Sequence, residues 1–411
     1  MRRKCTDSLI QWKKNPHRHP LLLQGLRQTG KTWLALDFAE KNYKNTLYLN
    51  LETDKPVSDY LSVPRPPQDA LLFLETYAGK PLLPSVSLLI LDNIQCVPKL
   101  STLLAALSLD YPQYHIIAIH RGLASPELYS KNDFHIISLY PLDFEEFLWA
   151  NAEYALSREI RRHFSTLTPL GKELHQKALS QFYLYLVTGG MPLSVLEYRR
   201  EKKLLMVPDI QQKLLELILG DISSQAPTGM TRHCQNAWLS IPAQLEKSSR
   251  KFQYSLITKG ATAKTYEKPL NWLLRSGYAL ACRQTSLHLY PTDCGLCARV
   301  LGVPSYQLLT GSDTPAARAC TETFLAQHFT RNGYTLSYWS SGNQAEVPFL
   351  LEKDGRHIAV DYRLTPHQKT RNLTRFRAEM NTDAEMYLLS VEDFREKENY
   401  HIVPVYAGFC V

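Results

Sequence analysis

The stretch that decides the fold reads Gly25-Leu26-Arg27-Gln28-Thr29-Gly30-Lys31-Thr32. It fits the pattern G-x-x-x-x-G-K-[ST], follows an apolar run at Pro20–Gln24 and opens a stretch with helical spacing. In this context the glycines let backbone N–H groups curl around a phosphate, and the helix N-terminus adds partial positive charge. Lys31 is expected to neutralise the β- and γ-phosphates while the Thr32 hydroxyl ligates Mg²⁺. These eight residues therefore predict a P-loop that binds ATP and Mg²⁺.

A second part of the same site is expected where the apolar run Val86–Asp92 ends in a carboxylate. This is the Walker B pattern, which predicts that Asp92 holds the Mg²⁺ shell together with Thr32. The next residue is Asn93, whose amide can hold a water molecule but cannot accept its proton. The expectation is therefore retained nucleotide binding with slow hydrolysis.

Five short apolar runs alternate with helical spacing in the first 140 residues. Near-continuous apolar runs of this length are typical of strands buried on both faces of a parallel sheet. Alternation of such strands with helices predicts a three-layer α/β domain over residues 1–140. The predicted strands are Pro20–Gln24, Thr46–Leu51, Val86–Asp92, His115–His120 and Phe134–Leu139, with helices at Thr32–Asn42 and Lys99–Asp110.

The remaining chain is predicted to form three further parts. Residues 141–225 read as a helical lid, and residues 226–303 as three helices and a hairpin, the pattern of a winged helix. Residues 304–411 begin with a Pro304–Pro315 linker and continue as an α/β module. Predicted helices are Asp143–Glu153, Tyr154–Phe164, Gly171–Thr188, Gln211–Leu219, Thr262–Ser276, Ala317–Asn332 and Lys369–Glu379. Predicted strands are Tyr278–Arg283, Ser286–Pro291, Thr335–Ser340, Glu346–Glu352, His357–Tyr362 and Ala384–Ser390.

The net charge of +8 is placed unevenly along the chain. Residues 226–300 contain ten lysines and arginines but three acidic residues, which accounts for most of the excess. Such a segment favours a nucleic-acid partner, with an ordinary solvated basic face as the alternative. The eight cysteines are spread thinly, and neither a signal peptide nor a membrane-length apolar run is seen. We expect a cytoplasmic protein with reduced thiols and no membrane partner.

Several motifs in order resemble a family of prokaryotic AAA-type ATPases whose C-terminal domain, of unknown function, is similar to the PD-(D/E)XK nuclease fold. The loop is similar to the family's G-x-R-Q-x-G-K-T, and Leu91–Gln95 resembles its L-D-E-I-Q. The other matching stretches are Leu139–Leu148 (family L-x-P-L-S-F-x-E-F), Gly189–Pro192 (G-G-x-P) and Leu289–Leu296 (Y-L-x-D-x-G-L). The resemblance implies an ATPase domain, a lid, a winged helix and a nuclease-like module.

The departures from the family pattern all bear on catalysis. Asn93 stands where the family has a glutamate that orients or deprotonates the attacking water. The family's G-S and G-R positions near the γ-phosphate are also altered, and Arg121 is the candidate substitute for a phosphate-sensing group. The predicted catalytic set is Asp92, Asn93 and Arg121, and the resemblance implies slow turnover.

The C-terminal module departs from an active nuclease in the same way. The resemblance places Pro348 at the metal-binding Asp and Arg363 at the catalytic Lys. Glu322, Glu346 and Asp361 remain as carboxylates that can gather around one ion. The main expectation is a fold that has kept its shape and lost its site. The C-x-x-C at Cys294–Cys297 is interpreted as ordinary packing, because no further pair of ligands accompanies it.

The combined prediction is an ATP-binding, slow nucleotide-dependent switch linked to nucleic acid through residues 226–300. One alternative is a nucleotide-gated module that binds another protein and never contacts nucleic acid. The other is an ATP-dependent nuclease. Oligomerisation stays open.

Overall fold

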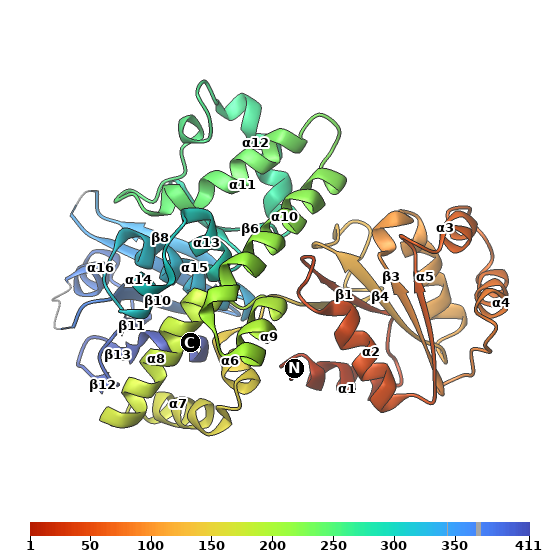
Figure 1. The fold of residues 1–411 in the computed structure, drawn as a ribbon, viewed down its shortest axis with the longest axis horizontal. Helices are drawn as coiled ribbons and strands as arrows, with labels where there is room; N and C mark the ends of the chain where they lie inside the picture. Colours follow the sequence, from red (N-terminus) through yellow and green to blue (C-terminus); the bar gives the residue numbers. More distant parts are fainter. Residues whose placement is uncertain (343, 367–370) are drawn as a thin grey trace. The chain divides into compact units, whose positions relative to one another are not determined.

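The computed structural model describes residues 1–342, 344–366 and 371–411. The described chain forms two compact units (Figure 1). One unit contains residues 2–140 and 275–277, and the other contains Met1 and residues 141–274 and 278–411. The division of residues 141–411 into a lid, a winged helix and a nuclease-like module stays a prediction, because these residues pack together in one unit.

The N-terminal unit is built on a five-stranded parallel sheet with the strand order β2-β3-β4-β1-β5. All five predicted strands are present, and their ends differ from the prediction by no more than one residue. The strands are β1 (Leu21–Gly25), β2 (Asn45–Asn50), β3 (Ser87–Asp92), β4 (His115–Arg121) and β5 (His135–Ser138).

Both faces of this sheet are buried, which explains its unbroken apolar runs. Leu88 and Ile90 of β3 pack into a core with α1 and α2, whereas Leu89 and Leu91 pack into a core with α3, α4 and α5. The helices are α1 (Thr6–Lys14), α2 (Lys31–Asn42), α3 (Lys55–Leu61), α4 (Pro67–Ala78) and α5 (Leu100–Asp110). Helices α3 and α4 were not predicted, since α3 is short and α4 begins with a proline at a position where helices accept one.

The carboxyl ends of the parallel strands meet at one edge of the sheet. Strand pairing sets Asn50 beside Asp92, and Gly25 beside Arg121. Ligands of open α/β sheets bind outside this edge. The sheet topology therefore gathers most of the predicted site residues at one place.

The second unit begins with helices and a hairpin. Its early helices are α6 (Phe144–Ala150), α7 (Tyr154–Thr166), α8 (Lys172–Thr188), α9 (Pro192–Glu201), α10 (Val207–Gln225), α11 (Thr231–Leu245) and α12 (Ala263–Arg275). Strands β6 (Ala279–Arg283) and β7 (Leu287–Pro291) pair antiparallel as the predicted hairpin. Helix α10 is twice as long as the predicted Gln211–Leu219, and α9 was not predicted. Proline falls in the first turn of both helices, which the sequence pattern alone did not mark as a start.

The C-terminal part carries a mixed six-stranded sheet with the order β12-β13-β11-β10-β9-β8. The predicted linker Pro304–Pro315 contains a short helix, α14 (Ser305–Leu309), so it is not unstructured. The strands of the sheet are β8 (Thr335–Ser340), β9 (Glu346–Lys353), β10 (Arg356–Arg363), β11 (Glu385–Ser390), β12 (Arg395–Glu396) and β13 (His401–Pro404). Its helices are α13 (Cys294–Leu301), α14 (Ser305–Leu309), α15 (Pro315–Arg331) and α16 (Asn372–Met380). Part of the predicted helix Lys369–Glu379, namely Lys369 and Thr370, lies outside the described residues. No helix in the described part of the chain has the length and hydropathy of a membrane span.

Three of the family-like motifs meet at one tight turn in this unit. The backbone N–H of Gly190 donates to Asp293 Oδ2 at 2.6 Å, and Leu142 N donates to the carbonyl of Gly190 at 2.6 Å. Asp293 also caps α13 by accepting from Leu296 N at 2.9 Å. Burial raises the pKa of Asp293 to about 6. The motifs therefore form one packed junction, which accounts for their residue types without a catalytic role.

Gly190→Ala is expected to destabilise the second unit by about 1–3 kcal/mol or more, because the added methyl overpacks a buried turn. A Cβ at Gly190 would lie 2.0 Å from the backbone oxygen of Leu142, which cannot move aside as a side chain can. Gly220→Ala is the matched control: a Cβ there meets nothing within 4 Å, and alanine favours the helix interior. Thermal denaturation, followed by circular dichroism, should show a lowered Tm for Gly190→Ala and no lowering for Gly220→Ala. Equal Tm values would contradict this packing.

Candidate nucleotide site

The P-loop is a strained connection between β1 and α2 that glycine makes accessible. Gly25 has φ +146°, and a Cβ there would lie 2.2 Å from the carbonyl oxygen of Leu139. Gly30 has φ +92° and precedes the first residue of α2. Thr29 Oγ1 donates to the carbonyl of Leu26 at 2.9 Å, which ties the loop to itself. Arg3 Nη1 donates to the carbonyl of Thr29 at 2.9 Å, so the loop is held both by its own hydrogen bond and by neighbouring parts of the chain.

Lys31 lies at the first position of α2, with its ammonium group folded over the loop. Its Nζ donates to the backbone oxygens of Gly25 and Leu26 at 2.8 and 2.7 Å. The side chain is mostly buried, at 8% exposure. An ammonium group held at the mouth of a backbone N–H loop is placed to neutralise phosphate oxygens.

The Thr32 hydroxyl and the Asp92 carboxylate lie within hydrogen-bond distance of each other, as two ligands of one Mg²⁺ ion should. Thr32 Oγ1 donates to Asp92 Oδ2 at 2.7 Å, and Tyr48 OH donates to the same oxygen at 3.0 Å. The backbone N–H of Asn93 donates to Asp92 Oδ1 at 2.8 Å, which fixes the carboxylate plane. Burial, followed by the charge of Asp92, raises the pKa of Tyr48, so its phenol stays a donor.

Asn93 and Arg121 belong to one polar network at the same edge of the sheet. Asn93 Nδ2 donates to Asn50 Oδ1 at 2.9 Å, and Arg121 Nη2 donates to Asn93 Oδ1 at 3.0 Å. Arg121 also forms an ion pair with Glu52, and this guanidinium lowers the pKa of the Glu52 carboxyl. Asn93 has φ +59°, a left-handed conformation that asparagine tolerates better than most residues.

These groups line one cavity of about 380 Å³. This volume is within the range of small-molecule sites. The lining residues are Arg27, Gln28, Gly30, Lys31, Thr32, Trp33, Tyr48, Asn50, Glu52, Asp92, Asn93 and Arg121. Of the predicted site residues, Gly25, Leu26 and Thr29 are buried and do not line the cavity, so they serve the loop through backbone and packing.

Four lining residues were missed from the sequence: Trp33, Tyr48, Asn50 and Glu52. Three of them come from β2 or directly follow it. Strand β2 pairs with β3 in parallel, and the side chains at its carboxyl end reach the same edge as Asp92. Predicting the strand order would have found Asn50 and Glu52, because β2 was itself correctly located. Trp33 follows the P-loop threonine and is half exposed, at 49%.

The residues present fit a Mg²⁺–nucleotide. Lys31, Arg27 and Arg121 supply positive charge toward a phosphate chain, while Asp92 and the Thr32 hydroxyl supply the oxygen ligands that Mg²⁺ prefers. When bound, Mg²⁺ would neutralise charge on the phosphate oxygens. The P-loop backbone, the oxygen ligands of Thr32 and Asp92 and the positive side chains all suit a Mg²⁺-bound nucleotide.

The three C-terminal carboxylates do not gather around one ion as the sequence allowed. Asp361 Oδ1 accepts from Arg363 Nη1 at 2.8 Å. Glu322 and Glu346 instead pair with Arg250. Among the described residues, no group of three or more His, Cys, Asp or Glu side chains is arranged to hold a metal ion. Pro348 is buried within β9. The loss of a nuclease metal site stays a prediction.

The C-x-x-C motif lies on the buried side of α13. Cys294 and Cys297 are free thiols with no exposed surface, and burial raises the pKa of Cys294 well above its usual value. A thiol with a raised pKa is a poor nucleophile and metal ligand. Packing accounts for both residues.

Two stretches of the chain match known families. Residues 17–148 match the family described as AAA domain, and residues 179–307 match a domain of unknown function. No curated protein matches the chain.

Among solved structures, the Walker-type ATPase PABY2304 of Pyrococcus abyssi is 14% identical, with a TM-score of 0.46, covering 73% of this chain and 95% of that one. The Drosophila ORC bound to DNA is 14% identical, with a TM-score of 0.25 and coverage of 72% and 94%. C. elegans PCH-2 is 12% identical, with a TM-score of 0.25 and coverage of 38% and 48%.

The family match covers the whole P-loop, the strand that ends in Asp92 and the edge residue Arg121. Residues 17–148 of this chain are therefore a P-loop ATPase domain of the AAA type.

Proposed function

We propose that the chain binds ATP with Mg²⁺ at Gly25–Thr32 and Asp92, hydrolyses it slowly, and uses the bound state to control contact with nucleic acid. The observation that carries the nucleotide assignment is the 2.7 Å hydrogen bond from Thr32 to Asp92. It joins the P-loop to the Walker B strand at the point where a Mg²⁺ ion requires both.

Slow hydrolysis is supported by the surroundings of Asn93. Its amide is engaged by Asn50 and Arg121 and offers no proton acceptor of useful basicity. Glu52 and Asp92 are the carboxylates in the cavity lining, and Arg121 holds Glu52 in an ion pair. The proposed roles are therefore binding for Lys31, Thr32 and Asp92, and incomplete positioning of water for Asn93.

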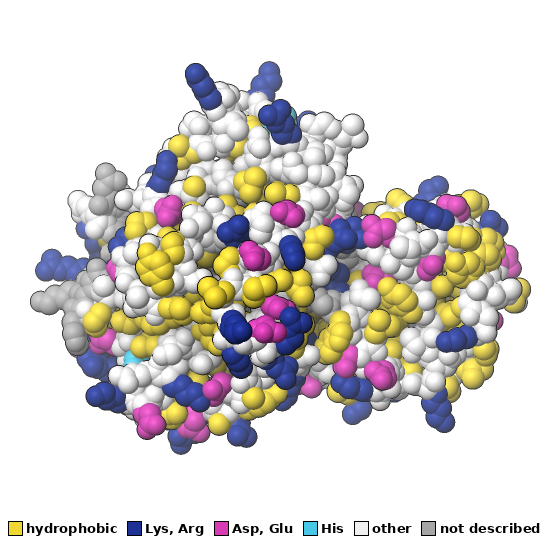
Figure 2. Space-filling view, in the orientation of Figure 1, with side chains coloured by type: hydrophobic (Ala, Val, Ile, Leu, Met, Phe, Trp, Pro, Cys, Tyr) yellow, Lys and Arg dark blue, Asp and Glu magenta, His cyan; other side chains and the backbone are white. Residues whose placement is uncertain are grey.

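The nucleic-acid link is supported by α11, α12 and the β6–β7 hairpin. Residues 226–303 were predicted to place three helices before the hairpin, but the structure, which describes this whole range, has two α-helices there, joined by a segment with one short 3-10 turn at Tyr254–Leu256, and α10 precedes this range. Trp238 Nε1 of α11 donates to the backbone oxygen of Tyr278 at 2.8 Å, and Tyr278 OH donates to Asp221 of α10 at 2.7 Å. These bonds tie α10 and α11 to the residue that precedes the hairpin. Figure 2 shows Lys and Arg side chains projecting from the surface that carries α11 and α12. Lys264 and Lys268 are exposed one helical turn apart on α12.

The runner-up function is nucleotide-gated binding of another protein. Exposed apolar side chains favour it: Leu193 and Leu196 lie on α9, and Leu205 and Met206 follow it. Patches of this kind mark protein interfaces. The third possibility, an ATP-dependent nuclease, is opposed by the arginines that pair with its candidate carboxylates.

Charge reversal tests the nucleic-acid proposal in the full chain. We expect Lys264→Glu/Lys268→Glu to weaken binding to duplex DNA at low salt, and to reduce the slope of log affinity against log salt by roughly two. Fluorescence anisotropy at several salt concentrations measures both quantities. Lys41→Glu is the matched control, because it reverses an exposed lysine in the ATPase domain. No binding by the folded wild type at low salt would favour the protein-binding alternative.

A further inference from the structure

Arg250 lies between Glu322 and Glu346, two of the three carboxylates that the nuclease-like pattern left as candidates to share one ion. Its Nε lies 2.5 Å from Glu322 Oε1, and its Nη1 lies 2.5 Å from Glu346 Oε1. Glu322 belongs to α15 and Glu346 begins β9, whereas Arg250 comes from the segment between α11 and α12. A side chain of the chain itself thus supplies the positive charge between the two carboxylates.

Glu322 requires a positive partner because it is buried. Its side chain is 1% exposed, and an isolated carboxylate in such a place is strongly disfavoured. Burial raises the pKa of Glu322, the charge of Arg250 opposes this, and the nearby Glu346 raises it further. Tyr362 OH donates to Glu322 Oε1 at 2.6 Å, but a phenol brings no charge. The guanidinium therefore supplies the positive charge that offsets the cost of burying Glu322 beside a second carboxylate.

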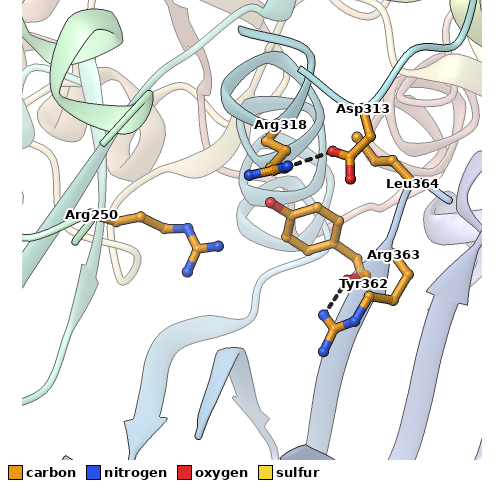
Figure 3. Close-up of a pocket in the computed structure, with 6 residues that line it drawn as sticks. All are labelled: Arg250, Asp313, Arg318, Tyr362, Arg363 and Leu364. Atoms are coloured by element: carbon orange, nitrogen blue, oxygen red, sulfur yellow. Dashed lines mark hydrogen bonds and ion pairs between the residues drawn. The ribbon is translucent and has the colours of Figure 1, made fainter. Parts of the chain in front are cut away.

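The guanidinium is accessible even though Glu322 is not. The Arg250 side chain is 22% exposed and the Glu346 side chain 31% exposed. Arg250 lines two cavities, of about 230 and 470 Å³. Figure 3 shows it extending toward Tyr362 across the smaller cavity. Removing the guanidinium would open space next to existing cavities, without emptying an apolar core.

We propose that Arg250 is a built-in substitute for a divalent cation, and that Glu322 and Glu346 bind Mg²⁺ or Mn²⁺ when this guanidinium is absent. Hard divalent cations take carboxylate oxygens, and Mg²⁺ commonly binds through one or two carboxylates while keeping several waters. In the wild type the guanidinium holds both carboxylates and excludes the ion. The proposal concerns residues remote in sequence from the P-loop and does not depend on nucleotide binding.

The test measures Mn²⁺ binding to nucleotide-free full-length protein by isothermal titration calorimetry and electron paramagnetic resonance. Arg250→Met is expected to bind one more Mn²⁺ per chain than the wild type. Adding Glu346→Gln is expected to remove that extra ion. Arg318→Met is the matched control: Arg318 lines the smaller cavity but pairs with Asp313, so its loss leaves Arg250 in place and should add no ion.

Folding is checked in the same samples, and Arg250→Gln serves as a second variant because it keeps hydrogen-bond donors while removing the charge. An Arg250→Met chain that folds only with Mn²⁺ present supports the proposal. It is overturned if folded Arg250→Met or Arg250→Gln binds no more Mn²⁺ than the wild type. An extra ion that persists after Glu346→Gln also overturns it, because the ion then lies elsewhere.

Discussion

Lys31→Ala should weaken Mg-ATP binding by roughly thirtyfold to several-thousandfold, corresponding to about 2–5 kcal/mol. The ammonium group of Lys31 lies over the P-loop, where it donates to the backbone oxygens of Gly25 and Leu26. Bound phosphates would accept these hydrogen bonds in their place, with the added strength of an ionic partner. Alanine removes the charge and leaves the phosphates without it in a partly buried site.

Titration calorimetry of both proteins with Mg-ATP measures this loss. Lys41→Ala is the matched control, since Lys41 lies on the same helix, is 65% exposed and pairs with Asp37. The control should keep wild-type affinity, and circular dichroism should show that both variants remain folded. Wild-type affinity in Lys31→Ala would mean that the nucleotide does not bind at this loop.

The fold of the N-terminal unit was predictable because its signals are local. Strand β3 is buried over its whole length, Ser87–Asp92, so it reads as a continuous apolar segment, and Gly25 and Gly30 occupy backbone conformations that glycine favours. Helices α3 and α4 gave weaker signals, because prolines interrupt the stretch between them. Their existence depends on packing against α5 and the sheet, which no local pattern encodes.

The site was predictable only where its residues belong to one motif. Lys31, Thr32 and Asp92 follow from spacing and from a strand that ends in an acid. Glu52 and Tyr48 were missed because their approach to Asp92 depends on β2 being the neighbour of β3, and strand order is a tertiary property. Arg250 illustrates the same limit, because its two partners lie on α15 and β9, more than seventy residues further along the chain.

Asn93→Glu is expected to raise the rate of ATP hydrolysis by roughly a hundredfold, the lower end of what general-base catalysis supplies. The wild type should bind ATP tightly and turn over far more slowly than about 10 per second, the typical enzyme rate. The gain is limited by the backbone, because glutamate tolerates the left-handed conformation of residue 93 less well than asparagine does. Steady-state phosphate release at saturating Mg-ATP measures the rates.

Asn93→Asp and Asn93→Ala separate basicity from shape. Aspartate keeps the size of asparagine and its tolerance for a positive φ, and Arg121 Nη2 remains within reach of its carboxylate. A gain with aspartate and glutamate but not with alanine assigns the defect of the wild type to the missing proton acceptor.

A rapid wild type would instead show that another group orients or deprotonates the water. The structure then points to Glu52, the carboxylate paired with Arg121 in the same cavity, and Glu52→Gln should abolish that activity. If the wild type is slow and neither Asn93→Asp nor Asn93→Glu accelerates it, the defect lies in the positive charge that should face the γ-phosphate. Arg121, the candidate for that charge, is already engaged by Glu52 and Asn93.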